Sequence, residues 1–132
     1  MKFMRLSKNF TLAELTKTNT GIPNIPSDIE VERLRLLCDK VLQPLRDIYG
    51  SPIIVNSGYR SQQVNKAVGG VPSSQHCRGE ASDITAGSRE RNRRLFEILK
   101  TMEFDQLISY DYSFLHVSYT ICRENRKQIL HK

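Results

Sequence analysis

The stretch SSQHCRGEASDI, residues 73–84, places a histidine, a glycine and an aspartate at short fixed intervals among residues as small as serine and alanine. Five of its positions form the pattern S-x-H-x-x-G-x-A-x-D: Ser74, His76, Gly79, Ala81 and Asp83. At average composition this pattern arises by chance on the order of once in ten thousand chains of this length. A lone histidine or aspartate is most often a surface or capping residue, so it is the spacing that favours a functional site.

The residues around Asp83, ASDIT, are typical of a β-strand, in which alternate side chains project to opposite faces. The later run FLHVSYT, residues 114–120, alternates in the same way. It puts Leu115 and Val117 on one face and His116 on the other. If the two apolar residues face the core, His116 faces a cleft, and the small neighbours of Asp83 leave room for the two side chains to meet there.

A second histidine, His76, lies in the loop that leads into the Asp83 strand, and Gly79 permits the chain to turn back so that the imidazole reaches the same point. Two imidazoles and one carboxylate are a ligand set suited to zinc, with the fourth position open to water. Zinc lowers the pKa of bound water to roughly 7, from 15.7 in bulk, and polarises a nearby carbonyl. The sequence therefore predicts a catalytic zinc site formed by His76, Asp83 and His116.

Two capping boxes predict helix starts, one at Thr11 with Glu14 and one at Ser27 with Glu30. The second helix is expected to be long, with Pro44 as a kink or a break. Its buried stripe recurs at three- to four-residue spacing: Val31, Leu34, Leu37, Val41, Leu45 and Ile48.

The rest of the chain predicts short strands and one more helix. Residues 52–58, PIIVNSG, are expected to form a buried strand, and Ser88 is expected to cap a helix with four exposed arginines. The inward face of that helix is Leu95, Phe96, Leu99 and Met102. DQLISY and FLHVSYT are expected to pair as antiparallel neighbours. The expected fold class is α+β, with a small antiparallel sheet and helices packed on one side of it. We expect a single domain, residues 1–132, with its core at 10–120. Residues 121–132 are expected to be a polar tail, to which no function is assigned.

Composition restricts the class of partner. The chain has 132 residues, 39% of them hydrophobic, and a formal net charge of +6. Such a charge favours polyanionic partners: nucleic acid, anionic lipid headgroups or bacterial wall polymers. The basic runs MKFMRLSK, SRERNRR and CRENRKQ lack the interleaved aromatics of a single-strand binding platform, and no nucleic-acid reading motif is present, so we expect no nucleic-acid partner.

Cysteine usage and hydropathy indicate the compartment. Cys38, Cys77 and Cys122 are odd in number and scattered, which favours a reducing environment over a disulfide framework. Cys77 directly follows His76, and adjacent side chains do not easily converge on one ion, so it is not counted as a ligand. The N-terminal MKFMRLSKNF has no continuous apolar run, and no run near 18 residues occurs elsewhere. We therefore expect a cytoplasmic protein with no signal peptide and no membrane span. We also expect it to be a monomer.

The segment SSQHCRGEASD resembles the zinc signature of the D-alanyl-D-alanine carboxypeptidase and murein endopeptidase family, whose fold is shared with lysostaphin-type peptidases and the hedgehog signalling domain. NFTLAELTKT, VNSGYRSQQVNKAVGG, FDQLIS and LHVSY are also similar to that family, so the resemblance spans residues 10–119. It is closest to stand-alone domains of phages, prophages and gut bacteria. This implies an endolysin-like protein that reaches the cell wall by a phage-type release, or an enzyme that recycles muropeptides in the cytosol.

The resemblance implies a role for each matched residue. His76, Asp83 and His116 would bind zinc, and Arg60, in SGYRS, would lie beside the metal and stabilise the developing oxyanion. Without the family match, Arg60 is more simply explained as a surface ion pair.

Other matched positions are implied to contact the substrate or to support the site. Ser74 and Tyr59 would bind the peptide, although Ser74 alone is equally typical of a turn. Gln106 and Ser118 match the family pattern and are expected to hold the ligands or the strands in place.

The sequence departs from the family at the general base. Related domains carry a catalytic Glu or Asp three or six positions before the last histidine, where this chain has Ser113 and Tyr110. Asp111 is the nearest carboxylate and would serve if a bulge shifted the register, but it is equally typical of a turn residue. Glu80 is a weaker candidate.

The function that the resemblance implies is a zinc metallopeptidase that hydrolyses an amide bond in the peptidoglycan stem peptide, of the D-Ala-D-Ala carboxypeptidase or murein endopeptidase type. The anionic sacculus suits a basic chain. The missing Glu leaves an alternative: a catalytically impaired, zinc-containing module that binds muropeptides without cleaving them.

Overall fold

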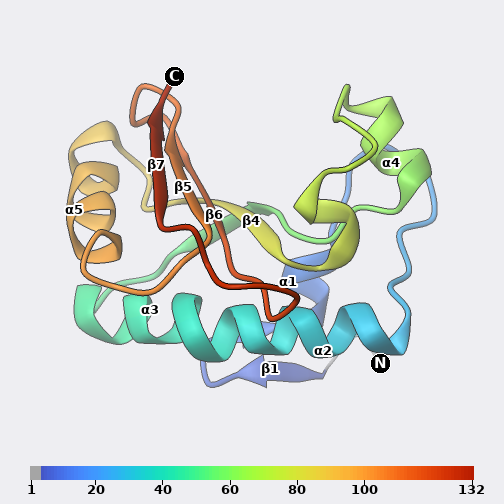
Figure 1. Ribbon diagram of the computed structural model, residues 1–132, viewed down its shortest axis with the longest axis horizontal. Coiled ribbons are helices and arrows are strands. Elements are labelled where there is room, and N and C mark those ends of the chain that lie inside the picture. Colours follow the sequence, from blue (N-terminus) through green and yellow to red (C-terminus); the bar gives the residue numbers. More distant parts are fainter. Residues whose placement is uncertain (1–3) are drawn as a thin grey trace.

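Five strands form one mixed sheet in the computed structural model, which describes residues 4–132 (Figure 1). In spatial order these are β3 (Ile54–Ser57), β4 (Ala81–Thr85), β6 (Leu115–Ser118), β5 (Gln106–Ser109) and β7 (Gln128–His131). Neighbours are antiparallel except β5 and β7, which are parallel. The α+β class and the pairing of β5 with β6 are confirmed, but the sheet is not wholly antiparallel. Residues 1–3, the start of the segment expected to lack an export signal, lie outside the described residues.

The C-terminal segment joins the sheet instead of forming a polar tail. β7 pairs along its whole length with β5, and the last pair in the register is Ser109 with His131. As an edge strand, β7 is mostly exposed, and its two apolar residues, Ile129 and Leu130, are adjacent, so it lacks the apolar alternation that marks a strand in the sequence. The expected core boundary at residue 120 is therefore corrected: the sheet extends to His131.

Both predicted capping boxes are present. The Thr11 hydroxyl accepts from the Glu14 N–H and the Glu14 carboxylate accepts from the Thr11 N–H, and Ser27 and Glu30 make the same exchange. The helices that follow are α1 (Leu12–Thr16) and α2 (Asp28–Leu37). Ahead of α1, two short strands pair with each other, β1 (Arg5–Ser7) and β2 (Phe10–Thr11).

The long helix continues past Pro44 through a π-helical turn. The segments after α2 are η1 (Cys38–Leu42) and α3 (Gln43–Tyr49). The Gln43 N–H bonds to the Cys38 carbonyl, so the backbone widens by one residue just where proline has no N–H to donate. The extra residue shifts the phase of the apolar stripe. Ile48, predicted to be buried, is 63% exposed, and Tyr49 packs on the core in its place.

The core lies between the helices and one face of the sheet. That face presents Ile84, Leu115, Val117 and Leu107, all fully buried. The third predicted helix, α5 (Arg89–Leu99), is capped by Ser88 and packs against α3, with its arginines exposed as expected. β3 is an edge strand in which Val55 is buried and Ile54 is half exposed, whereas the sequence predicts a buried strand.

The connection from β3 to β4 contains a short helix, α4 (Gln62–Ala67), and a 3₁₀ turn, η2 (Gln75–Arg78). It passes over the face of the sheet that the core helices leave uncovered. No helix within residues 4–132 has the length and apolar character needed to cross a membrane.

Candidate metal centre

Strand pairing brings two of the predicted ligands together. In the register of β4 and β6, Asp83 lies directly opposite His116, and Asp83 Oδ1 is 3.0 Å from His116 Nδ1. Leu115 and Val117, on either side of His116, are fully buried on the opposite face. The alternation seen in the sequence therefore directs Asp83 and His116 to the cavity side of the sheet.

The third ligand comes from η2. The Ser74 hydroxyl caps this turn by accepting from the His76 N–H, and the chain reverses at Gly79, where φ is +74°. A Cβ on Gly79 would lie 2.6 Å from the Glu30 carbonyl oxygen, so the turn packs against α2 without room for a side chain. The reversal brings His76 Nε2 to 3.3 Å from Asp83 Oδ1.

The tautomer of His76 is fixed from behind. Its Nδ1 lies 2.7 Å from the Gly58 carbonyl oxygen, so Nδ1 keeps its proton and Nε2 is the nitrogen that faces the site and is placed to bind a metal. Gly58 is needed here, because a Cβ would lie 2.4 Å from the Leu15 carbonyl oxygen. The ring is only 3% exposed, which holds this orientation.

The three side chains fit a zinc ion. One nitrogen or oxygen atom from each of His76, Asp83 and His116 lies within 4.8 Å of the other two. Ligand atoms at tetrahedral zinc, bound at about 2.0–2.1 Å, lie about 3.3 Å apart. The two contacts of Asp83, at 3.3 and 3.0 Å, match that spacing. Burial raises the pKa of Asp83, but hydrogen bonds from His116 and His76 outweigh it and hold the pKa below its usual range, so the carboxylate is ionised and ready to bind a cation.

Arg60 lies against the same carboxylate. Its Nη2 is 3.4 Å from Asp83 Oδ2, while Nε donates to Ser57 and Nη1 to Asn65. Its side chain is only 17% exposed, and it lines the cavity above the site. It is therefore not a surface ion pair, the alternative that the residue alone favoured.

A cavity of about 480 Å³ opens over the three ligands. Gln106 and Tyr110 line it, as does Ser74, so Ser74 is both a cap and a cavity residue. Ser118 is fully buried and accepts from the Gln106 N–H, which links the two strands. Among the residues that line this cavity, Asp83 carries the only carboxylate.

The structure does not bring Asp111 to the site. Asp111 and Tyr112 both have positive φ, 52° and 56°, in the tight turn between β5 and β6. The Asp111 side chain is 81% exposed and pairs with Arg89 at 3.3 Å, outside the cavity lining. The pairing of β5 with β6 keeps one register from Leu107 with Val117 to Ser109 with Leu115, so no shift brings Asp111 to the cavity side.

Tyr59 and Glu80 are also buried outside the cavity, in contact with other residues. Tyr59 is 6% exposed within the core, and burial, followed by the charge of Glu30, raises its pKa to about 12. Its ring is thus a packing element and does not line the cavity. Glu80 is 1% exposed and accepts from the Thr120 hydroxyl at 2.8 Å and from Arg78 at 3.0 Å.

The polar cavity residues to which the sequence assigned no role include Gln75, Tyr110, Arg123 and Arg126. Tyr110 stacks on Phe114 with ring centroids 4.6 Å apart. Burial, then the charge of Asp83, raises the pKa of its hydroxyl, although Arg60 opposes this. The arginines looked like part of a solvated tail, and only the pairing of β7 brings them to the cavity. The signal for Tyr110 was its position six residues before His116, where related domains can carry the catalytic Glu or Asp. No role was assigned to Tyr110, because a phenol is not a base at neutral pH.

Comparison with known proteins agrees with this geometry. Residues 8–118 match the family described as Peptidase M15. The chain is also similar to the zinc D-Ala-D-Ala carboxypeptidase of Streptomyces albus G, with 39% identity over 83 residues, which is 61% of this chain and 32% of that protein. The chain thus spans about a third of the length of that curated relative. With residues 8–118 matched and a candidate ligand set that fits zinc, the chain belongs to the peptidase M15 family.

Proposed function

We propose that this protein hydrolyses an amide bond in the stem peptide of peptidoglycan, with zinc held by His76, Asp83 and His116. The observation that carries the proposal is the convergence of these three side chains under an open cavity beside Arg60. The name of the Streptomyces relative supports a D-Ala-D-Ala type of substrate. The net charge of +6 suits an anionic wall polymer, and the resemblance to phage-type domains supports release to the wall from the cytoplasm.

The residues of the chain divide the chemistry among them. Zinc, when bound, supplies a Lewis acid that activates water and polarises the scissile carbonyl. Arg60, fixed by Ser57 and Asn65, has a guanidinium aimed at the region where negative charge develops on the substrate oxygen. Tyr110 lines the cavity and keeps its phenolic proton at neutral pH, so its hydroxyl is available to donate a hydrogen bond to a substrate there. Ser74, on the cavity wall, is the proposed contact for the peptide.

Metal content and wall digestion test this function together. Purified protein is expected to hold about one zinc per chain and to release peptides from purified peptidoglycan, as detected by mass spectrometry. His76→Ala and His116→Ala are expected to lose both properties. His131→Ala is the matched control, because the remaining histidine of the chain lies in β7 and outside the ligand group. A wild-type protein that neither contains nor takes up zinc would refute the proposal.

One observation favours a second candidate, a zinc-containing module that binds muropeptides without cleaving them. Asp83 is the only carboxylate on the cavity wall, and it is a metal ligand, so no separate carboxylate base lines the cavity. Zinc-loaded protein that binds muropeptides in calorimetry, yet leaves purified peptidoglycan intact, would favour this candidate.

A further inference from the structure

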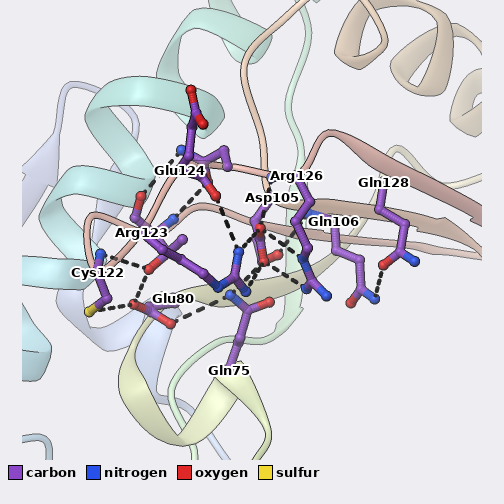
Figure 2. Close-up of polar contacts among 12 residues, drawn as sticks. Gln75, Glu80, Asp105, Gln106, Cys122, Arg123, Glu124, Arg126 and Gln128 are labelled. Carbon is purple, nitrogen blue, oxygen red and sulfur yellow. Dashed lines mark hydrogen bonds and ion pairs between the residues drawn. The ribbon is translucent and has the colours of Figure 1, made fainter.

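Two arginines form part of the cavity wall away from the metal ligands. Arg123 and Arg126 lie between β6 and β7, and both line the cavity with nearly half of each side chain exposed (Figure 2). Their common partner is Asp105, which is fully buried next to the start of β5. The metallopeptidase chemistry described above uses none of these three residues.

Asp105 holds both arginines in place. Oδ1 accepts from Arg123 Nη1, from Arg126 Nε and from the Arg126 backbone N–H. Oδ2 accepts from Arg123 Nη2, from Arg126 Nη2 and from the side chain of Gln75. Every lone pair of the carboxylate is therefore occupied, and the two guanidinium groups are fixed before any ligand arrives.

Each arginine has a second hydrogen-bonding edge to spare. A guanidinium presents two edges that fit a carboxylate: a side edge, Nε with Nη2, and an end edge, Nη1 with Nη2. Arg126 gives its side edge to Asp105, and Arg123 gives its end edge. Within residues 4–132, neither Arg126 Nη1 nor Arg123 Nε has a hydrogen-bond acceptor. One further carboxylate could accept hydrogen bonds from these free donors.

The charges of the cluster also require an anion. Two guanidinium groups face one buried carboxylate, and the neighbouring Arg78 is already paired with Glu80. Since the one carboxylate on the cavity wall is Asp83, beside the metal, a positive charge is left uncompensated at this end of the cavity. A substrate carboxylate that reaches this end meets a fixed, partly desolvated cation.

The position of the arginines sets the distance to the reacting bond. The row Asp83, His116, Ile108 crosses the sheet, and Gln106 lies two residues further along β5, where it pairs with Gln128 of β7. With strands about 4.8 Å apart and about 3.3 Å per residue, the start of β5, where Asp105 holds the arginines, lies roughly 10 Å from the candidate metal ligands. That distance corresponds to about two to three residues of extended peptide.

We infer that Arg123 and Arg126 form a carboxylate subsite that selects peptides with a free carboxylate about two to three residues from the scissile bond. This inference rests on the proposed function, and it names the feature of the stem peptide that the cavity recognises. The carboxylate is either the C-terminal one or that of an internal acidic residue, and the chemistry of recognition is the same for both.

The test uses one synthetic stem pentapeptide in three forms: both carboxylates free, the C-terminal carboxylate amidated, and the internal carboxylate amidated. Wild-type protein is expected to have a KM at least roughly tenfold higher for the one form that lacks the recognised carboxylate. The form that is affected identifies the source. Arg126→Gln is expected to raise KM for the free peptide by a similar factor, with little change in kcat. For the amidated form that lacks the recognised carboxylate, Arg126→Gln is expected to have the same KM as the wild type. Arg126→Lys keeps the charge but not the fork and is expected to fall between.

Two controls separate recognition from folding. Arg94→Gln makes the same charge change on the exposed face of α5 and should leave every KM unchanged. Arg123→Gln is the second variant if Arg126→Gln unfolds, because each substitution leaves one arginine on Asp105. Equal loss on free and amidated peptides would indicate a purely structural role and overturn the subsite.

Calorimetry on the zinc-free protein keeps this inference distinct from the proposed function. If the wild-type protein cleaves all three forms equally and binds them equally, the subsite is refuted while the peptidase function stands. If it cleaves none of them but binds the free form more tightly, and Arg126→Gln abolishes that preference, the subsite stands while the peptidase function fails.

Discussion

At the scale of single residues, Tyr110 is the cavity group most open to test. It occupies a position where related domains have an acid, and its raised pKa keeps it a hydrogen-bond donor at neutral pH. Tyr110→Phe is expected to lower kcat roughly tenfold, the effect of losing one hydrogen bond to developing charge, with zinc content unchanged. Steady-state kinetics on the stem pentapeptide measure this. Tyr112→Phe is the matched control, because Tyr112 packs on Phe96 outside the cavity. An unchanged kcat in Tyr110→Phe would exclude the hydroxyl from the chemistry.

Asp111 gives the converse prediction at the same scale. Its exposed carboxylate pairs with Arg89, and such surface pairs contribute at most about 1 kcal/mol. Asp111→Asn is therefore expected to leave kcat, KM and zinc content within twofold of wild type, whereas Asp83→Asn loses the metal. A large fall in kcat for Asp111→Asn, with zinc retained, would mean that the turn rearranges during turnover to bring a base to the substrate.

At the scale of elements, the turn from η2 into β4 decides where His76 lies. Gly79 has φ of +74° and packs against the Glu30 carbonyl, whereas Gly69 has φ of +80° with open space around it. Gly69→Ala is expected to cost about 1–2 kcal/mol of unfolding free energy, from backbone strain alone. Gly79→Ala is expected to cost more and also to weaken zinc binding, because the clash moves η2. Urea unfolding and zinc titration check this, and equal effects of the two substitutions would contradict it.

The elements that could be predicted from the sequence are those with a local physical signal. Capping boxes at Thr11 and Ser27 set two helix starts, and alternation around His116 set the face of β6. The π turn was not predictable, because its cause is the missing N–H of Pro44 combined with packing of the residues on both sides. β7 was missed because an exposed edge strand is held by backbone pairing and by Asp105, a contact with residues far away in the sequence.

In the candidate site, too, only the residues with a local sequence signal could be predicted. The convergence of its three candidate ligands was predictable, because two of them follow from strand alternation and the third from a glycine-permitted reversal. Tyr59 lies in the core while its neighbour Arg60 lines the cavity, because adjacent side chains point in different directions. The arginine cluster could not be foreseen, since nothing local distinguishes Arg123 and Arg126 from solvated arginines.

At the scale of the whole molecule, Asp105 ties the end of the chain to the sheet and makes stability depend on pH. Burial raises the pKa of Asp105, but hydrogen bonds from Arg123 and Arg126 outweigh it, so the pKa in the folded protein is below its usual range. The unfolded chain, with an ordinary pKa of about 3.9, then binds more protons than the folded chain in acid. The stabilisation is therefore fully present above about pH 4 and is lost as the pH falls through the lower pKa of the folded state.

Asp105→Asn isolates that contribution. The variant is expected to be less stable than wild type at pH 7, because two arginines lose their shared anion, and the difference should shrink as the pH falls below about 4. Chemical unfolding at a series of pH values measures this difference in unfolding free energy. Zinc-free protein is used for both chains, so that loss of zinc at low pH does not contribute to the result. Asp39→Asn, on the exposed side of η1, removes the same charge and should leave the pH profile unchanged.

A stability difference between Asp105→Asn and wild type that is constant from pH 7 to pH 3 would show that Asp105 acts by packing rather than by charge. In that case the arginines would not be held by an ionised partner, and the preorganisation on which the carboxylate subsite depends would be lost as well.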